Sequence, residues 1–128
     1  MEVKWSGFSA PFSVEKVKSY ATESAGVYLL SVRLKTDKFP LKWRCSFVGQ
    51  AKNIKQRLLD HLSDSEENKC IKEMVSKFFF GFEYAVISKQ EDRAGAEKYL
   101  YDHYKPECNN VDPGGKPIEI NLPYFNTA

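Results

Sequence analysis

Two stretches of this chain decide its fold: residues 26–34, which read GVYLLSVRL, and residues 42–49, which read KWRCSFVG. Both are rich in β-branched and aromatic residues, and the second alternates apolar with polar positions, as a half-buried strand does. The segment between them, 35–40, is a polar turn that ends in Pro40. We therefore expect the two stretches to pair as an antiparallel hairpin.

Helical patterns flank this hairpin on both sides in the sequence. Ser13 and Asn53 are each suited to cap a helix, because their side chains accept hydrogen bonds from free backbone N–H groups. Apolar residues recur at helical spacing in the later segments, and Pro106 stops the last of them. The pattern predicts helices at 13–24, 54–62, about 65–77 and 91–104.

The remaining segments complete the expected fold. A third strand is predicted at 79–88, and the segment 108–128 is expected to form turns with a short extended piece at 118–122. After the first helix the order is strand, strand, helix, helix, strand, helix. This order predicts an α+β fold with a small three-stranded, mainly antiparallel sheet flanked by helices.

Length and composition favour one soluble globular domain. The chain has 128 residues, of which 42% are hydrophobic and 28% charged, and these shares exclude a disordered chain. Apolar runs such as 78–80 are too short for a membrane span, and no signal peptide is visible. We expect one domain over residues 1–128, with a core at about 24–112, a helix at about 13–24 and an extension at about 113–128.

The cysteines are three in number and widely spaced: Cys45, Cys70 and Cys108. An odd set without a Cys-x-x-Cys pair argues against a disulfide scaffold and against a structural zinc site. We therefore expect buried or inert thiols and a protein of the reducing cytoplasm.

Positive charge is concentrated in one segment. The formal net charge is only +2, but residues 31–57 hold eight basic residues against the single acidic Asp37, a local charge of +7. Such a segment attracts polyanions, because local potential governs encounter. The candidate nucleic-acid contacts are Lys42, Arg44, Lys52 and Lys55. The alternative is a solvated hairpin whose lysines serve solubility.

Four residues carry side chains suited to hydrolytic chemistry: Tyr28, Arg57, His61 and Glu97. Arg57 and His61 are four residues apart on one helical face. The stretch Phe47-Val48-Gly49 ends a strand in glycine, where a backbone can approach a ligand closely. Taken singly, each of the four is more often a core or solvated residue than a functional one.

The order of these residues resembles the GIY-YIG nuclease family over about residues 24–112. In that family the first motif ends in Tyr, as in 26–28 here, and the second usually reads Tyr-Ile-Gly, where this chain has 47–49. An Arg then follows on a helix, a Glu on a later helix, and an Asn after a Lys-Pro pair, matching Arg57, Glu97 and Asn109. The resemblance is to members of the type found in the incising subunit of nucleotide-excision repair.

This resemblance implies a role for each matching residue. Glu97 is expected to hold one Mg²⁺ or Mn²⁺ ion and leave its other sites to water and phosphate. Arg57 is expected to bind a phosphate oxygen as negative charge builds. Tyr28 is expected to position or deprotonate the attacking water, and His61 to assist proton transfer or contact phosphate. Asn109 is expected to support the site by hydrogen bonding.

The chain departs from the family pattern at three places. Phe47 lacks the hydroxyl of the usual Tyr, and Gln50 stands after Gly49 where many relatives carry Lys. The link 29–46 is longer than usual and carries much of the basic cluster. The first two changes imply a slower enzyme, because losing one transition-state donor costs about 10²–10³ in rate.

The reading that follows is a metal-dependent endonuclease that hydrolyses DNA, in repair or recombination, as a monomer without membrane association. One alternative is a catalytically weakened module of the same fold that only binds nucleic acid. The other is a protein-interaction domain, with the aromatic pair 124–125 as a docking segment, although we expect Tyr124 and Phe125 to pack on the core.

Overall fold

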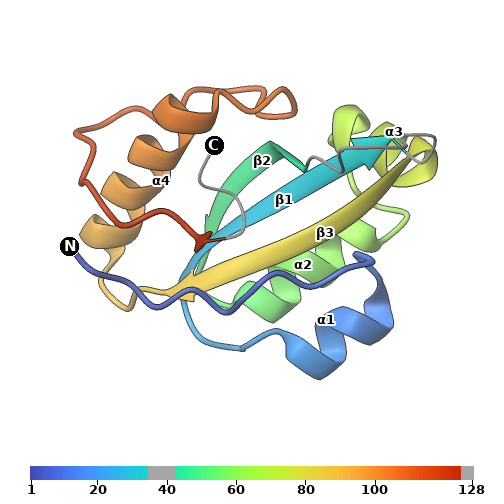
Figure 1. Cartoon of the computed structure of the whole chain (residues 1–128), viewed down its shortest axis with the longest axis horizontal. Coiled ribbons are helices and arrows are strands. Elements are labelled where there is room, and N and C mark those ends of the chain that lie inside the picture. Colours follow the sequence, from blue (N-terminus) through green and yellow to red (C-terminus); the bar gives the residue numbers. More distant parts are fainter. Residues whose placement is uncertain (35–42, 125–128) are drawn as a thin grey trace.

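The computed structural model describes residues 1–34 and 43–124 (Figure 1). In chain order its elements are α1 (Val14–Tyr20), β1 (Gly26–Leu34), β2 (Arg44–Ala51), α2 (Ile54–Leu62), α3 (Lys69–Lys77), β3 (Phe78–Val86) and α4 (Gln90–Tyr104). The three strands form one antiparallel sheet in the order β2-β1-β3. The predicted α+β fold is confirmed.

The central strand, β1, pairs along its length with both neighbours. Tyr28 lies opposite Gly49 of β2 and opposite Tyr84 of β3, and the register with β2 shifts between Leu30 and Ser31. The hairpin expected from the sequence is thus present. Its second strand begins at Arg44 and runs to Ala51, two residues further than expected.

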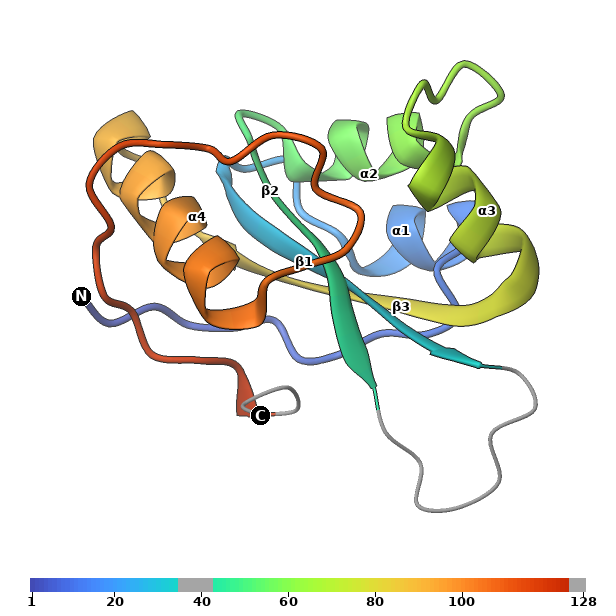
Figure 2. The ribbon, with the colours of Figure 1, turned by 90° about the horizontal axis from the view of Figure 1, so that it is seen from above.

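Helices cover both faces of the sheet (Figure 2). On one face, side chains of α1, α2 and α3 pack on Tyr28, Leu30 and Val32 of β1. On the other face, α4 packs on Val27 and Leu29. Because β1 is buried on both sides, its sequence is nearly all apolar rather than alternating. None of the described helices is long and apolar enough to cross a membrane.

Local hydrogen bonds explain where two helices depart from expectation. α1 ends at Tyr20 rather than residue 24, because the following residues turn to bond the next helix: the carbonyls of Thr22 and Ser24 accept from the backbone N–H groups of Lys55 and Ile54. α3 begins at Lys69 rather than residue 65. Its start is fixed by Asn68, whose side chain accepts from the N–H of Ile71 at 3.1 Å.

Both edges of the sheet are covered. Residues 5–12 run along β3 with bridges at Trp5–Ala85 and Ser9–Phe82. On the β2 edge, the N–H of Cys108 donates to the carbonyl of Ser46 at 2.8 Å. Covered edges remove the unpaired backbone groups through which sheets aggregate.

The extended piece predicted at 118–122 is not a strand in the described part of the chain. Instead the N–H of Ile118 bonds the carbonyl of Gly95 on α4, and Ile120 is buried. Asn121 bonds the backbone of Val3 through both ends of its amide, at 2.7 and 2.9 Å. The two terminal segments therefore lie side by side (Figure 1).

Two sequence expectations are wrong. Cys70 and Cys108 form a disulfide, and only Cys45 is a buried free thiol among the described residues. The two cysteines are 38 residues apart, and the sequence pattern does not show that the start of α3 lies next to the segment after α4. Tyr124 does not pack on the core either, since it is 98% exposed. Phe125 lies outside the described residues.

Candidate active site

Tyr28 and His61 meet in the interior of the protein. The Tyr28 side chain points from β1 towards α2, whose last turn carries His61, and the hydroxyl lies 2.7 Å from Nε2 of the imidazole. Both residues are at most 2% exposed. Two positions that the sequence singled out separately, 33 residues apart, are therefore one hydrogen-bonded pair.

A third residue, Glu66, completes this arrangement. Its Oε2 lies 2.7 Å from Nδ1 of His61, and its Oε1 accepts from the N–H of Asn68 at 2.8 Å. A carboxylate only accepts hydrogen bonds, so Nδ1 carries the proton and Nε2 is left to accept the proton of the Tyr28 hydroxyl. The sequence motifs do not mark Glu66, because it lies in the turn after α2 rather than on a helical face.

Burial sets the protonation of this pair. Burial raises the pKa of Tyr28 well above its usual range; nearby Arg57 lowers that pKa, and the charges of Glu97 and Glu66 raise it further. Burial also lowers the pKa of His61, an effect that Arg57 strengthens and Glu66 opposes. Both side chains are therefore neutral at pH 7.

Arg57 lies one turn before His61 on the exposed side of α2. It lines a cavity of about 420 Å³ together with Asp60, Ser65, Glu66 and Glu67. An exposed guanidinium can bind an anion from solution, but here Asp60, Glu66 and Glu67 line the same cavity and compete for it.

Glu97 approaches the same region from the opposite face of the sheet. It projects from α4, and its Oε1 accepts a hydrogen bond from the Gln50 amide of β2 at 3.3 Å. Burial raises the pKa of Glu97, and the bond from Gln50 opposes that rise. Gln50 follows Gly49 on β2, so Glu97 lies next to the strand against which Tyr28 packs.

Gly49 makes room for the Tyr28 ring on β2. A Cβ atom at this position would lie 2.4 Å from both Cζ and the hydroxyl oxygen of Tyr28, closer than side chains tolerate. Phe47, on the same strand, stands beside the pair, with its ring centroid 6.1 Å from Tyr28 and 5.1 Å from His61. The glycine of the second motif is thus required by the tyrosine of the first.

Asn109 acts on the strand that carries this motif. Its Oδ1 accepts from the N–H of Val48, and its Nδ2 donates to the carbonyl of the same residue, each at 2.9 Å. Asn109 therefore holds β2 in place next to Gly49, without contacting the four candidate catalytic side chains itself.

The predicted nucleic-acid contacts do not share one environment. Arg44 is paired with Glu107 at 2.8 Å. Lys52 is exposed and Lys55 half-buried. Both lie around the start of α2 and precede Arg57 in the sequence. Lys42 falls outside the described residues.

The residues around Glu97 suit a hard divalent cation held by few protein atoms. Within the described ranges no cluster of three or more His, Cys, Asp or Glu side chains forms a metal site. In the same part of the chain, the Glu97 carboxylate receives a single side-chain hydrogen bond, from Gln50. Mg²⁺ keeps most of its waters and needs only one or two carboxylates, so the donor set fits it.

Comparison with known proteins gives consistent relatives. No family model matches the chain. It is 32% identical over 107 residues to the UvrABC system protein C of Aquifex aeolicus, covering 82% of this chain and 17% of that protein. It is 29% identical over 89 residues to the same protein of Rickettsia canadensis, covering 70% of this chain and 12% of that one. The chain thus spans less than a fifth of these relatives' length.

Solved structures of one domain resemble the fold. The GIY-YIG N-terminal endonuclease domain of UvrC from Thermotoga maritima, bound to magnesium as its catalytic divalent cation, superimposes with a TM-score of 0.52 at 24% identity. The match covers 74% of this chain and 97% of that domain. A Tyr-to-Phe point mutant of the same domain, also bound to the catalytic cation, gives a TM-score of 0.52 at 25% identity over the same shares of the two chains.

Proposed function

This chain has a GIY-YIG domain similar to that of UvrC, and from that premise we propose that it is a metal-dependent endonuclease that hydrolyses DNA phosphodiester bonds. One observation supports the proposal most: Tyr28 of β1 bonds His61 of α2 and lies against Gly49 of β2, and Glu97 of α4 bonds Gln50, the next residue of that strand. The likeness to UvrC favours a role in DNA repair and a cytoplasmic location, whereas the Cys70–Cys108 disulfide removes the argument from free thiols.

Glu97 is the proposed ligand of a Mg²⁺ or Mn²⁺ ion. When bound, such an ion stabilises the charge on the leaving oxygen of a phosphodiester. The half-buried carboxylate suits a cation, because burial disfavours its isolated charge and, among the described residues, a single side-chain amide bonds it. The Tyr-to-Phe variants of the UvrC domain keep their cation, so the absence of a hydroxyl at Phe47 is compatible with this role.

Arg57 is the proposed phosphate ligand. Arg57 is exposed, lines the cavity that also contains Glu66, and lies close enough to Tyr28 to lower the pKa of that phenol. There it would bind a non-bridging oxygen and oppose the negative charge that builds as water attacks phosphorus.

Tyr28, His61 and Glu66 form the proposed proton path. Burial makes a free tyrosinate unfavourable, so Tyr28 is not a base standing alone. As the Tyr28 hydroxyl accepts a proton from the attacking water, it passes its own proton to Nε2 of His61. The imidazolium that forms is stabilised by the Glu66 carboxylate on Nδ1.

The test is nicking of supercoiled plasmid in Mg²⁺ or Mn²⁺. We expect the unmodified protein to nick, and Glu97→Gln to abolish nicking while keeping the shape of the side chain. Glu91→Gln is the matched control, since Glu91 is exposed on the first turn of the same helix. An unmodified protein that does not nick, or a Glu97→Gln variant that nicks equally well, would contradict the proposal.

A second candidate is a module that binds DNA without cutting it. Phe47 and Gln50 favour this candidate, because the first removes a hydroxyl and the second bonds the Glu97 oxygen that a cation would use. In that case the protein would retain DNA on a filter, with an affinity that falls steeply with salt, and leave plasmid intact under all metal conditions.

A further inference from the structure

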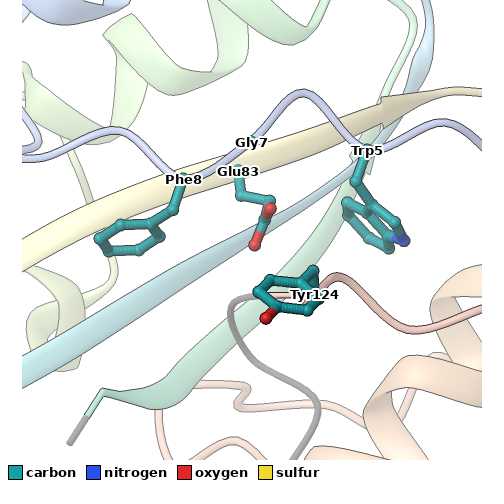
Figure 3. Close-up of a pocket in the computed structure, with 5 residues that line it drawn as sticks. All are labelled: Trp5, Gly7, Phe8, Glu83 and Tyr124. Atoms are coloured by element: carbon teal, nitrogen blue, oxygen red, sulfur yellow. The ribbon is translucent and has the colours of Figure 1, made fainter.

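An aromatic pocket lies on the outer side of β3, away from the candidate active site (Figure 3). It has a volume of about 340 Å³ and is lined by Trp5, Gly7, Phe8, Glu83 and Tyr124. None of these residues belongs to the candidate active site. The volume is within the roughly 300–1,000 Å³ of small-molecule sites, at the small end.

The walls of the pocket are held by backbone and side-chain contacts. The indole Nε1 of Trp5 donates to the carbonyl of Asn121 at 2.9 Å, and the Trp5 backbone forms a bridge with Ala85. Phe8 packs edge-on against Trp43 with 4.7 Å between ring centroids. Tyr124 stands opposite these two rings and is exposed, so the pocket is open on that side.

The floor of the pocket is a carboxyl group without a partner. Glu83 is only 3% exposed, and its carboxyl group points between Phe8 and Trp5 towards Tyr124 (Figure 3). Within the described residues it makes no hydrogen bond through its side chain and no ion pair. Burial raises the pKa of Glu83 to about 7, close to neutral pH.

In residues 1–34 and 43–124, no cationic side chain is paired with Glu83. The titratable groups that face it in these ranges are the thiol of Cys45 on β2 and the phenols of Tyr104 on α4 and Tyr124. Burial raises the pKa of both Cys45 and Tyr104, so neither group provides a positive charge. An unpaired acid is costly to bury, and a cation bound beside it would offset that cost.

We propose that this pocket binds a methylated ammonium group, with the rings of Trp5, Phe8 and Tyr124 around the cation and the Glu83 carboxylate as its counter-ion. A cation near the face of an aromatic ring is attracted by the negative charge of the ring face, and tryptophan is the strongest of the three. The carboxylate adds a direct charge interaction, which is stronger at a protein surface than in bulk water.

Hydration selects among cations. A small ion or an unmethylated ammonium is strongly hydrated. On entering the pocket it would lose its water and gain too few hydrogen-bond acceptors in return, because the pocket offers one carboxyl group among aromatic rings. Methyl groups spread the charge and weaken hydration, so a methylated ammonium loses less on entry. A neutral apolar ligand would fill the same space but leave the carboxylate unpaired.

The test compares choline with 3,3-dimethyl-1-butanol, which has the same shape with carbon in place of the charged nitrogen. Titration calorimetry on the full chain should show saturable binding of choline at pH 8 and at least tenfold weaker binding of the neutral compound. Between pH 8 and pH 6 choline affinity should fall about tenfold, since protonation of a carboxyl group with a pKa near 7 removes the charge. Glu83→Gln should abolish the preference for choline, and Trp5→Leu should weaken choline binding.

The matched control is Glu15→Gln, an exposed glutamate on α1, on the other face of the sheet. It should bind choline like the unmodified protein. Equal binding of the two compounds, no choline binding by the unmodified protein, or undiminished preference in a folded Glu83→Gln variant would each overturn the proposal. Plasmid nicking by Glu83→Gln should be unchanged, which separates this pocket from the proposed nuclease site.

Discussion

Glu66 is the residue that turns a buried tyrosine–histidine contact into a directed proton path. It bonds Nδ1 of His61 and so leaves Nε2 free to accept from Tyr28. Because the contact is made through the imidazole, Glu66 is a positioning residue.

We expect Glu66→Gln to slow plasmid nicking about tenfold to a hundredfold, less than the roughly 10²–10⁴ that a general acid–base group contributes, because Glu66 acts only through His61. Glu66 raises the pKa of His61, so its loss lowers that pKa and moves the acidic limb of the pH–rate profile to lower pH. Glu91→Gln, at an exposed position of α4 outside the Arg57 cavity, is the control and should leave rate and profile unchanged. An unshifted limb in Glu66→Gln would contradict the proton path.

Glu83 also has a consequence for stability. Its pKa rises from 4.5 in the unfolded chain to about 7 in the folded protein, so the folded state holds its proton more tightly. The stabilisation is fully present below pH 4.5 and is lost as pH rises through 7. In the unmodified protein this titration lowers the free energy of unfolding by up to about 3 kcal/mol as the pH rises. We expect Glu83→Gln to remove this fall, as measured by urea titrations between pH 5 and 8. A variant with the same slope as the unmodified protein would show that the carboxyl group is solvated.

Among single residues, the sequence could identify those candidate site residues that follow the order of the family motifs. Tyr28, Arg57, His61 and Glu97 were found because they lie at family positions, and Tyr28 and His61 do form a contact. Glu66 and Glu83 were not found. Glu66 reaches His61 only through the turn after α2, and Glu83 faces aromatic residues from both ends of the chain.

Among the elements, the helix ends were predicted least well. Helix α2 was predicted residue for residue, because Asn53 caps it and its apolar residues keep helical spacing. The end of α1 and the start of α3 depend on hydrogen bonds to other segments, which periodicity does not contain.

The disulfide connects elements that both support the site. Cys70 lies in the first turn of α3, after the loop that carries Glu66, and Cys108 precedes Asn109, which holds β2 at Val48. Asn68 also donates to the carbonyl of Cys108 at 2.9 Å. The β2 edge and the loop after α2 are thus tied at one point.

We expect dithiothreitol to lower the free energy of unfolding by about 2–4 kcal/mol, the usual contribution of a disulfide that closes a loop of this length. The double variant Cys70→Ser, Cys108→Ser should show the same loss and no response to reductant. Urea titrations of both proteins, with and without reductant, provide the measurement. Identical unfolding of the unmodified protein in the two conditions would mean that the cysteines are reduced in solution, as the sequence suggested.

Across the whole molecule, two of the three predicted nucleic-acid contacts that the structure describes lie around the start of α2. Lys52 and Lys55 precede Arg57 on the chain, whereas Arg44 is paired with Glu107. A DNA strand that reaches Arg57 would therefore pass these lysines.

We expect the double variant Lys52→Gln, Lys55→Gln to bind DNA more weakly and to reduce the slope of log affinity against log salt by about one to two, given a slope of about 0.9 for each phosphate contact. Fluorescence anisotropy of a labelled duplex at several salt concentrations measures this slope. Lys116→Gln, an exposed lysine of the C-terminal segment, should have no effect. An unchanged slope in the double variant would place the DNA on another surface.

The division of the candidate site between two layers allows its two tasks to change independently. The carboxylate assigned to the metal comes from α4, whereas the arginine and the histidine come from α2, and β2 separates the two helices. Substitutions that repack one helix need not disturb the other. In a diverged homologue, cation binding could therefore persist after hydrolysis is lost, and phosphate binding could persist after cation binding is lost.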